Sequence, residues 1–141
     1  MKKESKFNTP ILIIAWKRPK KTKELINKIK EISPNSLYIA CDGPKNENTD
    51  EDNKVMETRE LLLKSFKEVN SKKYLFSKNN QGCKIGVSNA INWFFEHEKE
   101  GIILEDDCIP HLDFFIFCEE MLKTYRNDER IWSITGHNQQ N

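Results

Sequence analysis

The chain has 141 residues, of which 37% are hydrophobic and 32% charged, and its 23 Lys and Arg residues nearly balance its 22 Asp and Glu residues. This length suits one compact domain and is short for two. The net charge of +1 argues against a general nucleic-acid binder, which needs surplus positive charge to displace counterions from phosphates.

The N-terminal residues match neither a signal peptide nor a membrane anchor. Residues 1–6 are mostly charged, and the apolar run over residues 11–16 that follows is short. A signal peptide needs an apolar stretch of ~7–15 residues with a cleavage site, and a membrane span needs ~20. We therefore expect a cytoplasmic protein without a transmembrane segment.

Short apolar runs alternate with stretches of helical period, which is the pattern of an α/β domain. The run over residues 11–16 predicts a central strand that is covered on both faces. Helical spacing begins at Pro19 and ends at Pro34. Residues 37–41 predict a second strand, which ends in the turn sequence Asp-Gly-Pro at 42–44.

The alternation continues through the second half of the chain. In order, we expect a polar loop (45–53), a helix (55–69), a strand (74–76), a loop (79–82), a helix (85–95), a strand (102–104), a helix (112–125) and a last strand (131–135). The predicted core residues on the last two helices are Trp93, Phe94, Phe95, Phe114, Phe117, Met121 and Leu122. Because the chain stops a few residues beyond a strand, we expect residues 1–141 to form one domain at the N-terminal end of a longer protein.

The cysteines at 41, 83, 108 and 118 form no C-x-x-C pair, and they have no zinc-like spacing with the three histidines. Cys41 and Cys108 lie beside apolar strand residues, where a cysteine behaves as a small hydrophobe. The prediction is four free, buried thiols in a reducing compartment.

Candidate functional residues follow the predicted strands, because ligands of an open parallel sheet bind outside the carboxyl ends of its strands. They are Lys17 and Arg18, Asp42 and Gly43, the loop 79–82 with Lys84, the triplet Glu105-Asp106-Asp107, and Gly136-His137-Asn138. The set contains cations for phosphates, and acids for a metal ion or for hydroxyl groups.

Three consecutive acids after an apolar strand repel one another unless a cation compensates them. Mg²⁺ and Mn²⁺ bind one or two carboxylates together with substrate phosphates. In an extended backbone the side chains of Glu105 and Asp107 point one way and that of Asp106 the other, so the triplet can divide its roles. A solvated acidic turn, or a cap for the next helix, explains the triplet equally well.

The other candidates also have ordinary structural explanations. Arg18, at the start of a predicted helix, either binds a phosphate or is a surface arginine. Asp42 either forms the turn or accepts hydrogen bonds from a ribose or a base. Lys84 either reaches a diphosphate or is one surface lysine among many, and His137 is either a ligand or a loop histidine.

Taken in order, these motifs resemble the GT-A class of glycosyltransferases. The matching stretches are Ala-Trp-Lys-Arg-Pro at 15–19, Cys-Asp-Gly-Pro at 41–44, Asn-Gln-Gly-Cys-Lys-Ile-Gly at 80–86 and Ile-Ile-Leu-Glu-Asp-Asp at 102–107. The resemblance covers residues 10–138 and is closest to the inverting group around N-acetylglucosaminyltransferase I, whose D-x-D-type metal motif reads Glu-Asp-Asp. Asp-Phe-Phe at 113–115 fits that group as well. The resemblance implies a three-layer, Rossmann-like α/β domain with a mostly parallel central sheet flanked by helices.

The resemblance also implies a function. The chain would bind a nucleoside diphosphate sugar, a UDP-sugar above all, with Mn²⁺ or Mg²⁺ as a Lewis acid that stabilises the leaving diphosphate. It would transfer the sugar to an unknown acceptor with inversion.

The implied site residues are Arg18 and Asp42 at the base, Asp106 at the ribose or diphosphate, Asp107 as the direct metal ligand, and Glu105 beside the metal or at the donor sugar. The general base of an inverting transfer lies far downstream of the metal motif in this group, and therefore beyond Asn141.

Two other enzyme classes are poor matches. Receiver-like domains and haloacid-dehalogenase phosphatases need acids directly after the first strand, where this chain has Lys17 and Arg18. A non-catalytic nucleotide-sugar-binding or regulatory module of the same fold stays open, because the chain offers no convincing general base.

Overall fold

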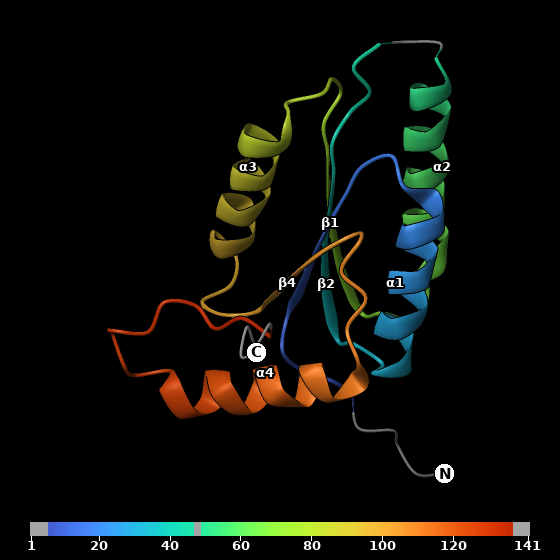
Figure 1. Cartoon of the computed structure of the whole chain (residues 1–141). Helices are drawn as coiled ribbons and strands as arrows, with labels where there is room; N and C mark the ends of the chain where they lie inside the picture. The colour runs from blue at the N-terminus through green and yellow to red at the C-terminus, as the bar shows by residue number, and fades with distance from the viewer. Residues whose placement is uncertain (1–5, 47–48, 137–141) are drawn as a thin grey trace, which may run out of the picture.

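The computed structural model describes residues 6–46 and 49–136. Strands and helices alternate along the chain (Figure 1), as the sequence predicts. In order they are β1 (Ile11–Ala15), α1 (Pro19–Glu31), β2 (Ser36–Cys41), α2 (Asp50–Ser65), β3 (Ser71–Phe76), α3 (Cys83–Phe95), β4 (Ile102–Glu105) and α4 (Leu112–Tyr125).

The four strands form one parallel sheet in the order β3-β2-β1-β4. Ile13, in the middle of β1, is in register with Ile39 of β2 and Leu104 of β4. The chain first builds the sheet outward from β1 through β2 to β3, and then returns to place β4 on the other side of β1. Between β1 and β4 the strand order thus reverses, and open α/β sheets bind ligands at such a reversal.

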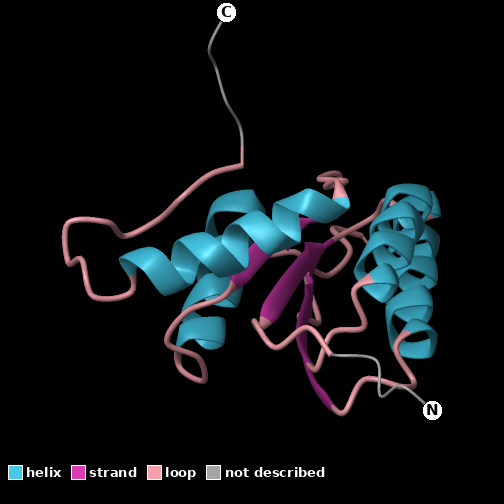
Figure 2. Cartoon of the chain, turned by 90° about the horizontal axis from the view of Figure 1, so that it is seen from below, coloured by secondary structure: helices cyan, strands magenta, loops and turns pink. Residues whose placement is uncertain are grey.

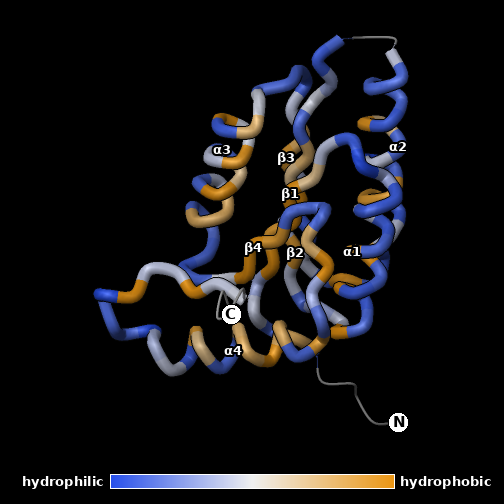
Figure 3. Tube along the Cα trace, in the orientation of Figure 1, coloured by the Kyte–Doolittle hydropathy of each residue, from blue (hydrophilic) through white to orange (hydrophobic). Residues whose placement is uncertain are grey.

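Helices cover both faces of the sheet, which confirms the predicted α/β fold with three layers. Helices α1 and α2 lie together on one face and α3 lies on the other (Figure 1), and the view from below shows the strands between them (Figure 2). Along β1, Ile11 and Ile13 belong to the larger core under α1 and α2, whereas Leu12 belongs to the smaller core under α3. The division of β1 between two cores follows from the alternation of side chains along a strand. Figure 3 shows the hydrophobic residues along the strands.

Two helices begin where their sequences provide a start signal. Pro19 occupies the first turn of α1, where its missing N–H and fixed φ are favourable. The side chain of Thr49 accepts a hydrogen bond from the N–H of Asp52, and the first turn of α2 carries three acids, which the helix dipole favours. This cap explains why α2 begins at Asp50 and not at the predicted residue 55.

The predicted last strand over residues 131–135 is wrong. The N–H of Ile131 donates to the carbonyl of Asp128 in a turn, and residues 131–135 form no strand. The side chain of Trp132 is 93% exposed. Alternating residues form a strand only where a neighbouring strand accepts their hydrogen bonds, and here none of the described residues pairs with the outer edge of β4.

Several predictions about the core also need correction. Phe94 is fully buried, but Phe95 is exposed and Trp93 is only partly buried. In α4 the buried residue is Phe115, whereas Phe117 is exposed. The remaining predicted residues of that helix, Phe114, Met121 and Leu122, are partly buried. A helix turns by about 100° per residue, so neighbouring aromatic residues cannot all face the sheet.

All four cysteines are free, as predicted, but only Cys41 is buried. Burial raises the pKa of the Cys41 thiol to about 11, so this residue behaves as a small hydrophobe. Cys83 and Cys108 are exposed, contrary to the prediction, because they lie at the carboxyl edge of the sheet. None of the described helices has the length and hydropathy that crossing a bilayer requires.

Candidate functional site at the carboxyl ends of the strands

The predicted site residues gather at the carboxyl edge of the sheet, where β1 and β4 end side by side. Arg18 follows β1, and Asp106 and Asp107 form the turn that follows β4. Because β1 and β4 are paired in parallel, residues 88 and 89 positions apart in sequence reach one point. This point is the reversal of strand order described above.

Arg18 connects the two aspartates directly. Its Nη1 atom donates to Oδ1 of Asp106 at 2.9 Å and to Oδ2 of Asp107 at 2.7 Å. The Arg18 side chain is 51% exposed, and those of Asp106 and Asp107 are 4% and 47% exposed. One guanidinium therefore bridges a buried and a half-exposed carboxylate.

The backbone of β1 holds the second oxygen of Asp106. The N–H of Trp16 donates to Asp106 Oδ2 at 2.9 Å, so Arg18 and Trp16 together satisfy both carboxylate oxygens. A buried carboxylate without such partners would be costly. The Trp16 indole N–H in turn donates to the carbonyl of Gly43 at 2.9 Å, which ties the end of β1 to the end of β2.

The acids also act on Arg18. The hydrogen bond that Arg18 donates to Asp106 is the largest cause that raises the pKa of the guanidinium, and the charges of Asp106, Asp107 and Glu105 raise it further. Arg18 is therefore a permanent positive charge among three acids. Glu105 and Asp107 are exposed while Asp106 is buried. The predicted opposite directions of Asp106 and Asp107 are wrong, because the two residues form a turn instead of continuing the strand, and both carboxylates reach the same nitrogen of Arg18.

Asp42, after β2, is engaged with the loop that follows β3. Its carboxylate accepts hydrogen bonds from the N–H groups of Gly43, Gln81 and Gly82 and from the side-chain amide of Asn80, at 2.8–3.2 Å. The loop lies so close to Gly43 that a Cβ there would be 2.6 Å from the Asn79 carbonyl carbon. Asp42 thus shapes the entry to α3 and has few hydrogen-bond positions left for a ligand.

We expect Asp42→Ala to lower the free energy of unfolding by about 1.5–3 kcal/mol, because it removes several hydrogen bonds to one charged group. Urea unfolding followed by circular dichroism measures the change. Glu60→Gln, at an exposed residue of α2, is the control and should change it by less than about 0.5 kcal/mol. An Asp42→Ala variant as stable as this control would contradict the role of Asp42 in the loop.

The remaining predicted residues do not join the cluster. Lys84 is exposed in the first turn of α3 and contacts none of the other candidates. His137 lies outside the described residues. The structure therefore brings together Arg18, Asp106 and Asp107. Asp42 is linked to the end of β1 through Gly43 and Trp16, and through its own N–H, which donates to the carbonyl of Ala15.

Sequence reasoning missed two residues of this edge. Trp16 ends the apolar run over residues 11–16 and lies in the matching stretch at 15–19, and nothing in the sequence indicates its two hydrogen bonds. Arg59 of α2 donates to the carbonyls of Cys41, Asp42 and Ser77 and so joins the ends of β2 and β3. Arg59 lies four residues after buried Val55 and three residues before buried Leu62. This spacing places Arg59 on the inner face of the helix, and it can be read from the sequence.

The donor set suits one kind of metal ion. The described residues contain no group of three or more His, Cys, Asp or Glu side chains that could hold a metal. Asp107 offers a half-exposed carboxylate at the strand reversal, and Glu105, two residues earlier, is exposed as well. Mg²⁺ and Mn²⁺ accept such a site, since they use one or two carboxylates and complete their shell with water and substrate phosphates.

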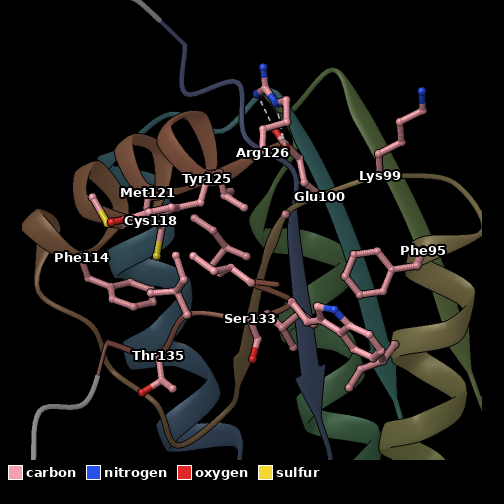
Figure 4. Close-up of a pocket in the computed structure, with 18 residues that line it drawn as sticks. Phe95, Lys99, Glu100, Phe114, Cys118, Met121, Tyr125, Arg126, Ser133 and Thr135 are labelled. Carbon is pink, nitrogen blue, oxygen red and sulfur yellow. Dashed lines mark hydrogen bonds and ion pairs between the residues drawn. The ribbon is translucent and has the colours of Figure 1, made fainter. Parts of the chain in front are cut away.

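Two hollows lie near the ends of the sheet. A small one of about 110 Å³ adjoins Asp42, Gln81 and Asn89 above an apolar floor of β1 and β2. A larger groove of about 620 Å³ follows the outer edge of β4, between Phe95 of α3 and Phe114, Met121 and Tyr125 of α4. Figure 4 shows these side chains around the groove. None of the predicted site residues lines it, so the larger hollow and the charged cluster are separate features.

Comparison with models of protein families gave no match, and comparisons with curated proteins and with solved structures gave none either. The resemblance to GT-A glycosyltransferases thus stays a prediction from the motifs. Its structural part, the α/β fold, agrees with the parallel sheet.

Proposed function

We propose that the chain binds a nucleoside diphosphate sugar with Mn²⁺ or Mg²⁺ at the carboxyl ends of β1 and β4, and that it is the donor-binding part of an inverting glycosyltransferase. The observation that carries the proposal is the bridge of Arg18 to Asp106 and Asp107 at the reversal of strand order. It combines a cation for phosphates with a half-exposed acid for a metal ion, and both are needed to hold a metal diphosphate.

The beginning of α1 supports the binding of phosphate. Arg18 precedes Pro19, its side chain caps no backbone N–H of this helix, and the first turn of α1 contains no acid. A helix N-terminus carries a partial positive charge and free N–H groups, which favour an anion. The diphosphate would lie between this helix end and Asp107.

Each acid of the triplet has a distinct part in the proposal. Asp107 would bind the cation, and exposed Glu105 would accept hydrogen bonds from hydroxyl groups of the donor sugar. Asp106 would position Arg18 and Trp16 from its buried place. When bound, the cation would act as a Lewis acid that offsets negative charge on the departing nucleoside diphosphate. Asp42 would act through the loop over residues 80–82, which it holds.

Calorimetric titration with UDP, GDP, CDP and ADP, each with and without Mn²⁺, tests the proposal. At least one diphosphate should bind about tenfold or more tightly with Mn²⁺ than without it. The corresponding monophosphate should gain much less, because it lacks the second phosphate that shares the metal. If no diphosphate gains affinity from Mn²⁺, the proposal is wrong.

Catalysis is tested separately by the release of the nucleoside diphosphate from sugar donors that carry the preferred base. Release above the rate without protein supports an enzyme. Tight metal-dependent binding without release would instead support a non-catalytic nucleotide-sugar-binding module of the same fold.

A further inference from the structure

We propose that Arg18 couples the two ligands of this site, holding Asp107 until a diphosphate takes the guanidinium and frees that carboxylate for the divalent cation. The inference rests on the proposed function and adds an order to it: the cation arrives with, or after, the diphosphate.

The first support is the difference between the two aspartates. Asp106 has both oxygens occupied, one by Arg18 and one by the N–H of Trp16, and it is buried. Among the described residues, Asp107 Oδ2 is held only by Arg18, and the side chain is 47% exposed. Its other oxygen has only a long contact of 3.9 Å with the Cys108 thiol. A cation that approaches from solvent therefore competes with Arg18 alone.

The second support is charge. A divalent cation at Asp107 would sit close to the guanidinium that is 2.7 Å from the same carboxylate, and like charges at such a distance repel strongly. A guanidinium keeps its charge in proteins, so the repulsion persists for as long as Arg18 stays beside Asp107. The guanidinium has to move, or the cation binds weakly.

The third support is that Arg18 has somewhere to go. Its side chain is 51% exposed, and it stands directly before the N-terminus of α1 without capping it. A diphosphate at this helix end presents oxygens in the geometry that a guanidinium binds through two parallel hydrogen bonds. Each ligand then favours the other, and the coupling is the same in both directions.

The experiment uses Mn²⁺ and inorganic pyrophosphate, which supplies the diphosphate without a base. Calorimetry gives the affinity for each alone and for Mn²⁺ in the presence of pyrophosphate, with the complex that the two form in solution included in the fit. In the unchanged protein, pyrophosphate should strengthen Mn²⁺ binding about tenfold or more. In Arg18→Gln, Mn²⁺ alone should bind about tenfold more tightly, and the strengthening by pyrophosphate should fall by a similar factor.

Lys23→Gln is the matched control. It removes the same charge from an exposed position of α1 that does not contact the acids, and it should alter Mn²⁺ affinity by less than about twofold. Arg18→Lys provides a second variant if Arg18→Gln does not fold. The lysine keeps the charge but not the planar fork, so Mn²⁺ alone should stay weak while the strengthening by pyrophosphate falls.

The outcomes separate this inference from the proposed function. If the unchanged protein shows no metal-dependent binding of any nucleoside diphosphate, the proposed function fails and the inference with it. If that binding is present but Arg18→Gln leaves the affinity for Mn²⁺ alone unchanged or weaker, only the inference is overturned. Unchanged strengthening by pyrophosphate in Arg18→Lys would overturn it as well.

Discussion

Phe94→Ala should lower the free energy of unfolding by about 3–5 kcal/mol, the usual cost of removing a fully buried phenylalanine. Phe94 has no exposed surface, and its ring meets Tyr38 edge-on with centroids 4.9 Å apart. The smaller core under α3 has only five buried members, so few neighbours can move to fill the cavity. Urea unfolding followed by circular dichroism measures the loss.

Phe95→Ala is the matched control, because it makes the same substitution at the next residue of α3. Phe95 is 47% exposed, and Phe95→Ala should cost about 1–2 kcal/mol, since about half of the Phe95 surface stays in water after folding. Equal losses at the two positions would contradict the orientation of α3 on the sheet.

These two phenylalanines also mark where sequence reasoning stops. The aromatic run at 93–95 predicts a helix with a buried face, but its period does not say which residue faces the sheet. That depends on how the helix is rotated when it packs, which is a tertiary property. The boundaries of α4 and the order of strands and helices, by contrast, follow from local hydrophobic spacing, and the structure confirms them.

The candidate site shows the same division. Placing Arg18 and the triplet at one edge of the sheet needed only the rule that parallel strands end together. The bridge from Arg18 to Asp106 cannot be predicted from this rule alone, because it requires β4 to pair with β1 and not with β3. The local spacing of hydrophobic residues does not determine the order of strands in the sheet. The wrong prediction of a strand over residues 131–135 has the same cause. The local sequence suggests a strand, but it does not show whether a neighbouring strand is present to pair with it.

Asp107→Ala should reduce metal-dependent binding of the preferred nucleoside diphosphate at least about 100-fold, because it removes the proposed direct ligand of the cation. Its effect on stability should be small, less than about 1 kcal/mol, since the carboxylate is half exposed and its one charged partner in the described part of the chain is a half-exposed arginine. Calorimetry in the presence of Mn²⁺ measures the effect on binding, and urea unfolding of the same preparation measures the effect on stability.

Asp106→Ala should give a different pattern, although the substitution is the same and the residues are adjacent. It leaves the N–H of Trp16 without its acceptor and removes a buried partner of Arg18, so it should cost about 1.5–3 kcal/mol of stability.

Asp50→Ala, at an 83% exposed acid of α2, should leave nucleotide binding within about twofold. A folded Asp107→Ala variant that still binds the diphosphate with Mn²⁺ as tightly as the Asp50→Ala control would exclude Asp107 as the ligand.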